Sequence, residues 1–493
     1  MFSKLSPKPT ARGYSDEISG FELFYQLVYM SATAAAGISR NRLFDLARLV
    51  PVPPARYFGE IQRLVETMRY NYPDACRIVG QRIKSEPVRT FMLRLSDALR
   101  SGEPMAAFLA REAEVQGENY ENEYERELES LKKWGDGYTS VMVSVALIVI
   151  VNLVSTMIYD IGLVTMLGMM VTACITSFVV AWVLLRSAPK ETISLSWSAG
   201  AADQRRSIKL IKILGPLALA TVPLLLLLDA GWAWTMIVPA LVLGPAGFVS
   251  MRADRHIEKK DQEVSPFLRS LGGTATSRGV TLGRALDVLE TDSFPTLEPD
   301  IKRLSQRLRA FVKPEICWDR FAVETGSLLI SQSTGVFFAA VNLGGDPEQT
   351  GLLSSLFAMK ASMLRAKRRG VAATFSWLAV VMHTIMAGIM IFLLEIIRLF
   401  ITLLGEAMSS LGQEGGEAVQ AMAGNVMAFN TPPVQLLETM TGGMILVLAF
   451  VNAFAIVASE GSHILKMVFY LAILVFSSGL CFWVVPPIVQ KIL

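Results

Sequence analysis

The chain has 493 residues, of which 52% are hydrophobic and 18% charged, and its mean hydropathy is +0.44. Soluble proteins usually carry about 25% charged residues, so this composition excludes an ordinary soluble protein. The formal net charge of +3 excludes a strongly basic nucleic-acid-binding protein, and four cysteines without a close pair exclude a disulfide framework or a zinc finger.

The segment 1–138 is predicted to form a helical bundle before the chain reaches its first long apolar run. Apolar residues recur here at helical spacing, for example over residues 61–68. The segment ends in a run of glutamates between residues 112 and 129, which includes Glu121 and Glu125. Such a run is typical of a solvated helix face, although it can also form a docking surface for a partner of complementary charge.

Seven later runs contain no Asp, Glu, Lys or Arg and are candidates for membrane-spanning helices. A spanning helix needs about 20 apolar residues, and in lipid a helix satisfies its own backbone hydrogen bonds. We expect four spans in 139–251, arranged as two hairpins around a basic loop at 186–212, and three spans in 371–493. The runs are 141–159, 161–185, 213–228, 231–251, 371–394, 440–459 and 467–489.

The distribution of Lys and Arg gives the expected orientation of these spans. The segments 1–138, 186–212 and 252–370 are rich in Lys and Arg, whereas 405–435 contains neither. Basic segments remain on the cytoplasmic side of a membrane. We therefore expect a multi-pass protein of the cytoplasmic (cell) membrane with its N-terminus in the cytoplasm. Seven crossings then place the C-terminus and an outer loop, 405–435, outside.

The charged segments 1–138 and 252–370 repeat each other. Gly37 matches Gly279, Gly102-Glu103-Pro104 matches Gly345-Asp346-Pro347, and two further matches lie between them in the same order. All four glycines fall between helical stretches, where glycine adopts the left-handed conformation that ends a helix. We therefore predict an all-α fold, a polytopic membrane protein with about seven transmembrane helices and two duplicated cytoplasmic helical bundles.

The two bundles resemble the F domain of type II secretion and type IV pilus assembly systems. The resemblance rests on helix–glycine–helix units such as LRSGEPMAAFL at 99–109 and ATSRGVTLGRALDVL at 275–289. The order of bundle, four spans, bundle and three spans is similar to that of archaellum (FlaJ-like) and archaeal type IV pilus platform proteins. This resemblance implies a membrane platform that is not an enzyme and needs no cofactor.

The resemblance also implies the partners of such a platform. They are a hexameric secretion ATPase on the cytoplasmic side, pilin-like or archaellin-like subunits in the membrane, the lipid bilayer and a second copy of the chain as a homodimer. The platform would couple the ATPase to the insertion of those subunits into a filament. The sequence is equally consistent with an archaellum, an adhesive pilus and another secretion filament.

Candidate docking residues for the ATPase lie in both bundles and in the loop between the hairpins. The second bundle carries a basic cluster whose counterpart in the first bundle is much less basic. Contact with lipid headgroups and plain solubility are alternative roles for this cluster, and topology determination is the alternative for the loop. The residues are Lys302, Arg303, Arg307, Arg309 and Lys313 of the cluster, Arg205 and Arg206 of the loop, and Glu121 and Glu125 of the acidic run.

A second basic group precedes the fifth span, and we expect it to anchor that span on the cytoplasmic side. Within the span lies His383, for which a hydrogen bond to a neighbouring helix is favoured over a proton pathway, because no acidic residue lies in any span. The basic group consists of Lys360, Arg365, Lys367, Arg368 and Arg369.

No motif for catalysis, a cofactor or a metal is present. The chain contains no P-loop, GxSxG, HExxH or CxxC pattern, so we assign no catalytic, cofactor-binding or metal-binding residue. The alternative function is a secondary transporter or permease with duplicated cytoplasmic regulatory domains. Transporters usually repeat their membrane halves, whereas here the repeat lies in the charged segments, and this favours the platform.

Overall fold

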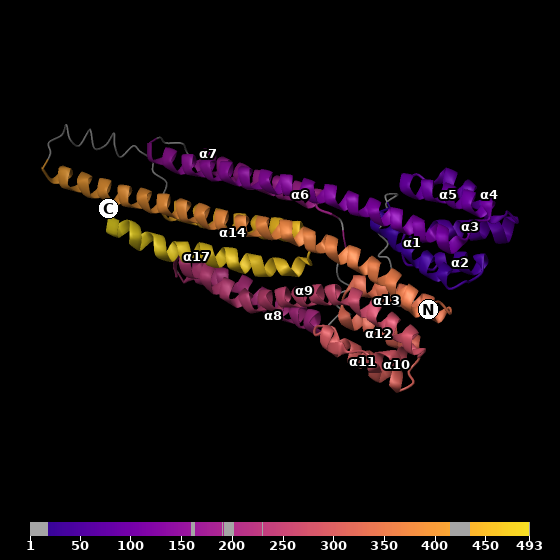
Figure 1. Ribbon diagram of the computed structural model, residues 1–493. Coiled ribbons are helices and arrows are strands. Elements are labelled where there is room, and N and C mark those ends of the chain that lie inside the picture. The colour runs from indigo at the N-terminus through magenta and orange to yellow at the C-terminus, as the bar shows by residue number, and fades with distance from the viewer. Residues whose placement is uncertain are drawn as a thin grey trace. The chain divides into compact units, whose positions relative to one another are not determined.

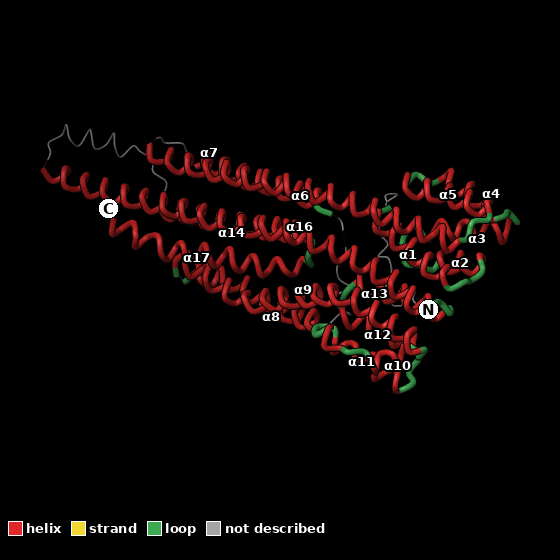
Figure 2. Tube along the Cα trace, viewed as in Figure 1, coloured by secondary structure: helices red, strands yellow, loops and turns green. Residues whose placement is uncertain are grey.

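The computed structural model describes residues 18–158, 163–189, 191, 202–228, 230–414 and 434–492. Within these ranges the regular elements are helices and there is no strand (Figures 1 and 2). The prediction of an all-α fold is therefore confirmed. Most of the predicted outer loop 405–435 lies outside the described residues, and so do residues 190 and 192–201 of the predicted basic loop 186–212. The last part of that predicted loop is helical, because α8 begins at Ala202.

The chain divides into two compact units. The first, which we call the bundle unit, comprises Met1–Arg126, Glu191–Arg205 and Ala253–Lys367. The second, which we call the span unit, comprises Glu127–Lys190, Arg206–Arg252 and Arg368–Leu493. Four long helices have residues in both units: α6 (Met105–Ile158), α8 (Ala202–Leu227), α9 (Gly231–Arg278) and α14 (Pro347–Glu414).

The first repeat of the bundle unit is a series of short helices, some of which begin at a capping side chain. Ser19 accepts a hydrogen bond from the backbone at the start of α1 and forms a capping box with Glu22. The Asn71 side chain accepts a hydrogen bond from the backbone N–H of Asp74 at the start of α4. The helices are α1 (Gly20–Ala35), α2 (Arg40–Ala47), α3 (Ala55–Met68), α4 (Tyr72–Arg82), α5 (Glu86–Ser101) and the first part of α6 (Met105–Ile158).

The second repeat follows the same order of helices. Leu282 begins a helix 242 residues after Arg40, and Glu298 begins one 243 residues after Ala55, in agreement with the offsets of the sequence matches. The elements are the end of α9 (Gly231–Arg278), α10 (Leu282–Val288), η2 (Thr291–Ser293), α11 (Glu298–Arg309), α12 (Pro314–Thr325), α13 (Leu328–Asn342) and the start of α14 (Pro347–Glu414).

Glycines in the left-handed conformation separate these helices, with one correction to the sequence prediction. Gly37, Gly102 and Gly279 have φ values of 73°, 77° and 59°. At the fourth turn the positive φ, 94°, belongs to Gly344 and not to Gly345. The turn uses two consecutive glycines, and the second donates its N–H back to the carbonyl of Ala340 at 3.0 Å, which closes the end of α13.

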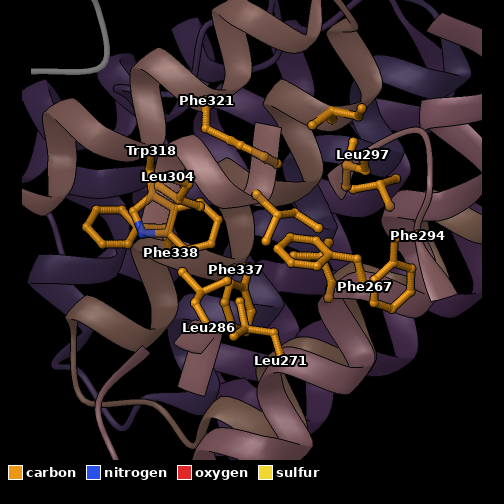
Figure 3. Close-up of a cluster of buried hydrophobic side chains, with 14 of the residues drawn as sticks. Phe267, Leu271, Leu286, Phe294, Leu297, Leu304, Trp318, Phe321, Phe337 and Phe338 are labelled. Atoms are coloured by element: carbon orange, nitrogen blue, oxygen red, sulfur yellow. The ribbon is translucent and has the colours of Figure 1, made fainter. Parts of the chain in front are cut away.

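An aromatic core holds the second repeat together (Figure 3). Phe267 of α9 packs edge-on against Phe294 and lies 6.0 Å from Phe321 of α12, measured between ring centroids. Trp318 of α12 stacks on Phe338 of α13. All five side chains are buried, so truncating any one of the phenylalanines to alanine should cost about 3–5 kcal/mol.

The part of the chain that the structure describes has seven helices long and apolar enough to cross a membrane, as predicted. They are α6, α7 (Leu163–Ser187), α8 (Ala202–Leu227), α9, α14, α16 (Val434–Glu460) and α17 (Met467–Ile492), the last preceded by the short η3 (Ile464–Lys466). In the span unit α16 packs against both α7 and α17. The protein is thus a polytopic, all-α membrane protein.

Candidate functional site

Most of the basic cluster is paired with carboxylates of its own repeat. Four of its five members form ion pairs: Lys302 with Glu298 at 2.6 Å, Arg303 with Asp300 and Glu324, Arg307 with Glu324, and Arg309 with Asp287 at 2.8 Å. The pairs with Glu324 join α11 to α12, and the pair with Asp287 joins α11 to α10. The cluster therefore presents less uncompensated positive charge than its sequence suggests, and its docking role stays a prediction.

The fifth member, Lys313, follows an exposed apolar turn. Phe311 is 96% exposed and has a φ of 56°, which is unusual for a residue other than glycine. Val312 and Ile316 beside it are also exposed, and within the described residues Lys313 forms no ion pair. Holding the backbone of a non-glycine residue in this conformation costs about 1–3 kcal/mol, and such strain is often found at functional positions.

The first repeat has a similar turn at the equivalent place. Arg69 has a φ of 60°, and the exposed side chains of Met68 and Tyr70 flank it. Among the described residues, Arg69 and Phe311 are the two non-glycine residues with positive φ. The duplicated bundle thus keeps a strained turn with exposed apolar side chains in both copies, while only the second copy places a lysine directly after it.

The acidic run pairs with α14 inside the bundle unit. Glu121 Oε2 lies 3.1 Å from the Nζ atom of Lys360, and Glu125 pairs with Lys367. The spacing of four residues puts both glutamates on one face of α6. Because both pairs are partly exposed to solvent, each contributes at most about 1 kcal/mol, so they orient α14 more than they stabilise it. A role of Glu121 and Glu125 in ATPase docking stays a prediction.

Arg365 differs from the membrane anchor that its sequence context predicts. Its side chain is 1% exposed and lies inside the bundle unit. Its Nε atom donates to Glu191 at 2.6 Å, and its Nη1 atom donates to Asp261 of α9 at 2.8 Å. Ser327, at the start of α13, donates its hydroxyl to the same aspartate. One arginine thereby joins three segments that are distant in sequence.

The side chains of the two acids around Arg365 are also buried, Asp261 at 1% and Glu191 at 6% exposure. Asp261 lies ten residues beyond the apolar run 231–251, and burial raises its pKa to about 6, although Arg365 and the Ser327 hydroxyl favour the ionised form. Glu191 also accepts a hydrogen bond from Tyr124 of α6 at 3.3 Å. Glu191 comes four residues after the end of α7, so this cluster ties the connection that follows α7 to the bundle unit.

A second buried arginine, Arg368, acts within the span unit. It donates to the carbonyls of Ala458 and Ser459 at 3.2 and 3.0 Å and to that of Pro189 at 2.8 Å. The first two carbonyls belong to the last turn of α16, where a positive charge also interacts favourably with the helix dipole. Arg368 therefore caps the end of a membrane helix.

His383 lies at the centre of a buried network of hydrogen-bonded side chains in the span unit. Asn452 of α16 donates to its Nδ1 atom at 3.0 Å, which leaves the proton on Nε2, 3.0 Å from the Ser478 hydroxyl of α17. Tyr138 of α6 donates to the side-chain carbonyl of Asn452 at 2.6 Å. The expected hydrogen bond from His383 to a neighbouring helix is therefore confirmed, and the hydrogen-bond network links four helices.

The remaining sequence candidates lie on α8. Arg205 and Arg206 are in its first turns, and both side chains are exposed. Their role as partner contacts stays a prediction. In the described part of the chain no group of three or more His, Cys, Asp or Glu residues is arranged to hold a metal ion.

Comparison with known proteins gives three matches. Residues 27–153 match the family model of the type II secretion system (T2SS), protein F. The chain is similar to the flagella accessory protein J of Methanocaldococcus jannaschii, with 27% identity over 312 residues that cover 60% of this chain and 54% of that protein. It is also similar to the flagella accessory protein J of Methanococcus voltae, with 26% identity over 330 residues that cover 63% of this chain and 58% of that protein.

The matched region spans a little over half the length of these relatives. No solved structure matches the chain. The family match covers the second half of α1, α2 to α5 and most of α6, and thus nearly all of the first repeat and the helix that leads from it into the first apolar run.

Proposed function

We propose that the chain is the membrane platform of a filament-assembly machine. Two similarities support this proposal: part of the chain matches the type II secretion F domain, and the chain is similar to archaeal flagella accessory J proteins. The machine would be an archaellum, a type IV pilus-like system or a type II secretion system. The observation that carries this proposal is the combination of two features: seven apolar helices among the described residues, and a duplicated charged bundle whose first copy matches the F domain.

The platform would convert the action of a cytoplasmic ATPase into movement of membrane helices. The Lys and Arg distribution supports a cytoplasmic position for the bundle unit. Each of α6, α9 and α14 continues from the bundle unit into an apolar run, and each would carry a displacement of the bundles toward the bilayer. Pilin-like subunits would then enter the filament along the membrane helices.

Within this function we place ATPase docking at the turn formed by Phe311, Val312 and Lys313. The apolar side chains are exposed, and Lys313 would add attraction for an acidic surface. The neighbouring arginines would shape this turn through their ion pairs with Asp287, Asp300 and Glu324, and would not themselves be the contacts.

Co-purification with the secretion ATPase of the same cell tests this proposal. The detergent-solubilised wild-type protein should retain the ATPase, and Lys313→Glu combined with Phe311→Ser should lose it. Tyr70→Ser, at the equivalent turn of the first repeat, is the matched control and should retain it. Failure of the wild-type protein to retain any ATPase would contradict the platform function, whereas full retention by the double variant would contradict only the docking position.

A further inference from the structure

A cavity of about 300 Å³ lies among helices of the span unit. Most of its lining comes from α6 and α14, and α7 and α16 contribute one residue each, Leu184 and Ser459. The described residues that line it include neither His383 nor any of its hydrogen-bond partners. This cavity is therefore separate from the buried hydrogen-bond network around His383.

All four helices place the cavity at one end of their apolar runs. On α6 its lining stops at Thr139, two residues before the first run begins, and on α14 it starts at Gly370, one residue before the fifth run. Its residues on α7 and α16 lie at the ends of the second and sixth runs. Since these runs span the hydrocarbon, the cavity lies at the boundary between hydrocarbon and lipid headgroups. The four runs are 141–159, 371–394, 161–185 and 440–459.

The interior of the cavity is apolar. The hydroxyl groups in its wall are already used within their own helices: Thr139 donates to the carbonyl of Asp136 at 2.8 Å, and Ser459 donates to that of Ile456 at 2.7 Å. Leu131 and Phe375 form other parts of the wall. An apolar cavity offers water no hydrogen-bond partners and takes up hydrocarbon more readily.

A glycine keeps the cavity wide on the α14 side. Gly370 lies in the interior of this long helix, where glycine costs about 0.5–1 kcal/mol relative to alanine. Its φ is not positive, and apart from the backbone of its own helix no atom lies within 4 Å of the place that a Cβ would occupy. Neither a turn nor close packing among the described residues requires a glycine here, whereas a large side chain would narrow the cavity.

Two opposite charges lie at the rim of the cavity. Lys132 and Asp136, one turn apart on α6, both line the cavity and are exposed. Their spacing of four residues would allow an ion pair, but neither side chain forms an ion pair with any described residue. A ligand that carries both a phosphate and an ammonium group would satisfy the two charges at once.

The size of the cavity limits what can enter it. One turn of an α-helix, about 10 Å across and 5.4 Å long, occupies roughly 400 Å³, so a membrane helix of another protein does not fit. A hydrocarbon chain is much thinner and can enter from the surrounding bilayer. The occupant that matches the position, the apolar interior and the charged rim is a lipid.

We propose that the cavity binds one phospholipid whose headgroup carries a primary amine. Part of one acyl chain fills the space beside Gly370, the phosphate contacts Lys132, and the amine donates to Asp136. The bound lipid thereby packs between α6 and α14 at the membrane boundary. This inference concerns the span unit alone and depends neither on ATPase docking nor on the platform function.

Mass spectrometry of the intact protein, released from a mild detergent, tests whether the cavity is occupied. Wild-type protein purified from its own membranes should retain one phospholipid per 54.1 kDa chain. Gly370→Phe should reduce the retained fraction several-fold, because the ring takes the place of the acyl chain. Gly168→Phe is the matched control, since Gly168 of α7 also has open space around it and lies outside the cavity.

Three results would overturn the proposal: a wild-type chain that retains no lipid, equal retention by the two phenylalanine variants, and a retained peptide in place of a lipid. Thermal unfolding of both variants without added lipid distinguishes a blocked cavity from a misfolded protein. The headgroup contacts are tested separately, because Lys132 and Asp136 are exposed and their substitution leaves the packed interior unchanged.

Titration of the delipidated protein with phosphatidylethanolamine and phosphatidylglycerol tests the rim. The wild-type protein should bind phosphatidylethanolamine more tightly. Lys132→Gln should weaken that binding about fivefold, whereas Lys133→Gln, at an exposed lysine outside the cavity lining, should leave it unchanged. Asp136→Asn should abolish the preference for phosphatidylethanolamine. Equal effects of the two lysine variants, or an unchanged preference in Asp136→Asn, would overturn the proposed headgroup.

Discussion

Arg365 and Asp261 form an ion pair in which the Nη1 and Oδ2 atoms lie 2.8 Å apart and both side chains are 1% exposed. The two residues are separated by 104 positions and join α14 to α9. Glu191 completes the cluster from the connection that follows α7. Buried charges of this kind are tolerated only when each one keeps its partner.

Removing the arginine should therefore destabilise the protein strongly. Arg365→Met leaves Asp261 and Glu191 buried without a compensating charge, and we expect a loss of about 3–5 kcal/mol in the free energy of unfolding. Denaturant unfolding in detergent measures this loss. Lys367→Met is the control, because Lys367 is 42% exposed, and it should cost at most about 1 kcal/mol. Similar losses in the two variants would contradict the role of Arg365.

The stability that the protein loses in Arg365→Met should depend on pH. Asp261 has a pKa of about 6 in the folded protein and about 4 when unfolded, so the folded state binds its proton more tightly and its contribution to stability falls as pH rises through this range. Without Arg365 the pKa of Asp261 should rise further. The loss of unfolding free energy in Arg365→Met should therefore be smaller at pH 5 than at pH 7. An equal deficit at both values would contradict this.

The glycine after α16 should not tolerate a side chain. Gly461 has a φ of 68°, and a Cβ atom there would lie 2.3 Å from the guanidinium of Arg368. Gly461→Ala would add backbone strain of about 1 kcal/mol and also displace an arginine that binds three carbonyls. Gly231→Ala is the control, because Gly231 has a φ of 78° and open space around it. Thermal unfolding should show a clearly larger effect at Gly461, and equal effects would refute the steric argument.

The thiol of Cys76 should be inert in the folded protein. The side chain is buried in the first repeat, and burial raises its pKa to about 12, so very little thiolate is present at neutral pH. Maleimide labelling followed by mass mapping should find Cys76 unmodified until denaturant is added. Met68→Cys, at a position 61% exposed, should react readily under the same conditions. Rapid native labelling of Cys76 would mean that the first repeat opens.

Apolar runs and the internal repeat are the parts of the fold that the sequence predicts well. Lipid requires continuous helices, so the spans are visible as runs without charge. The repeat is visible because glycine is needed wherever a helix ends in the left-handed conformation. Even so, sequence alone assigns the fourth turn to Gly345, since it cannot decide which of two adjacent glycines, Gly344 or Gly345, takes the positive φ.

The ion pairs of the bundle unit are only partly predictable. The spacing of Lys302 from Glu298, and of Arg303 from Asp300, is that of helix neighbours and could have been identified from the sequence. The partners of Arg365 could not, because Glu191 and Asp261 lie 174 and 104 residues away. Only the tertiary fold distinguishes a buried arginine from the membrane anchor expected beside an apolar run.

The exposed apolar residues at the start of α14 show the same limit of sequence-based prediction. The heptad spacing of Leu352, Leu356, Met359 and Met363 is present in the sequence, but so is an equally apolar face that contains Phe357. Which of the two faces contacts the bundle unit, and which remains bare, depends on how α1 and α9 pack against the helix.

Counting filaments on intact cells tests the proposed platform function most directly. Deletion of the gene in its own organism should abolish a surface filament seen by electron microscopy while the filament subunits accumulate in the membrane. Expression of the wild-type chain should restore the filament. Filaments of normal number and length on the deletion strain would contradict the function proposed for this protein.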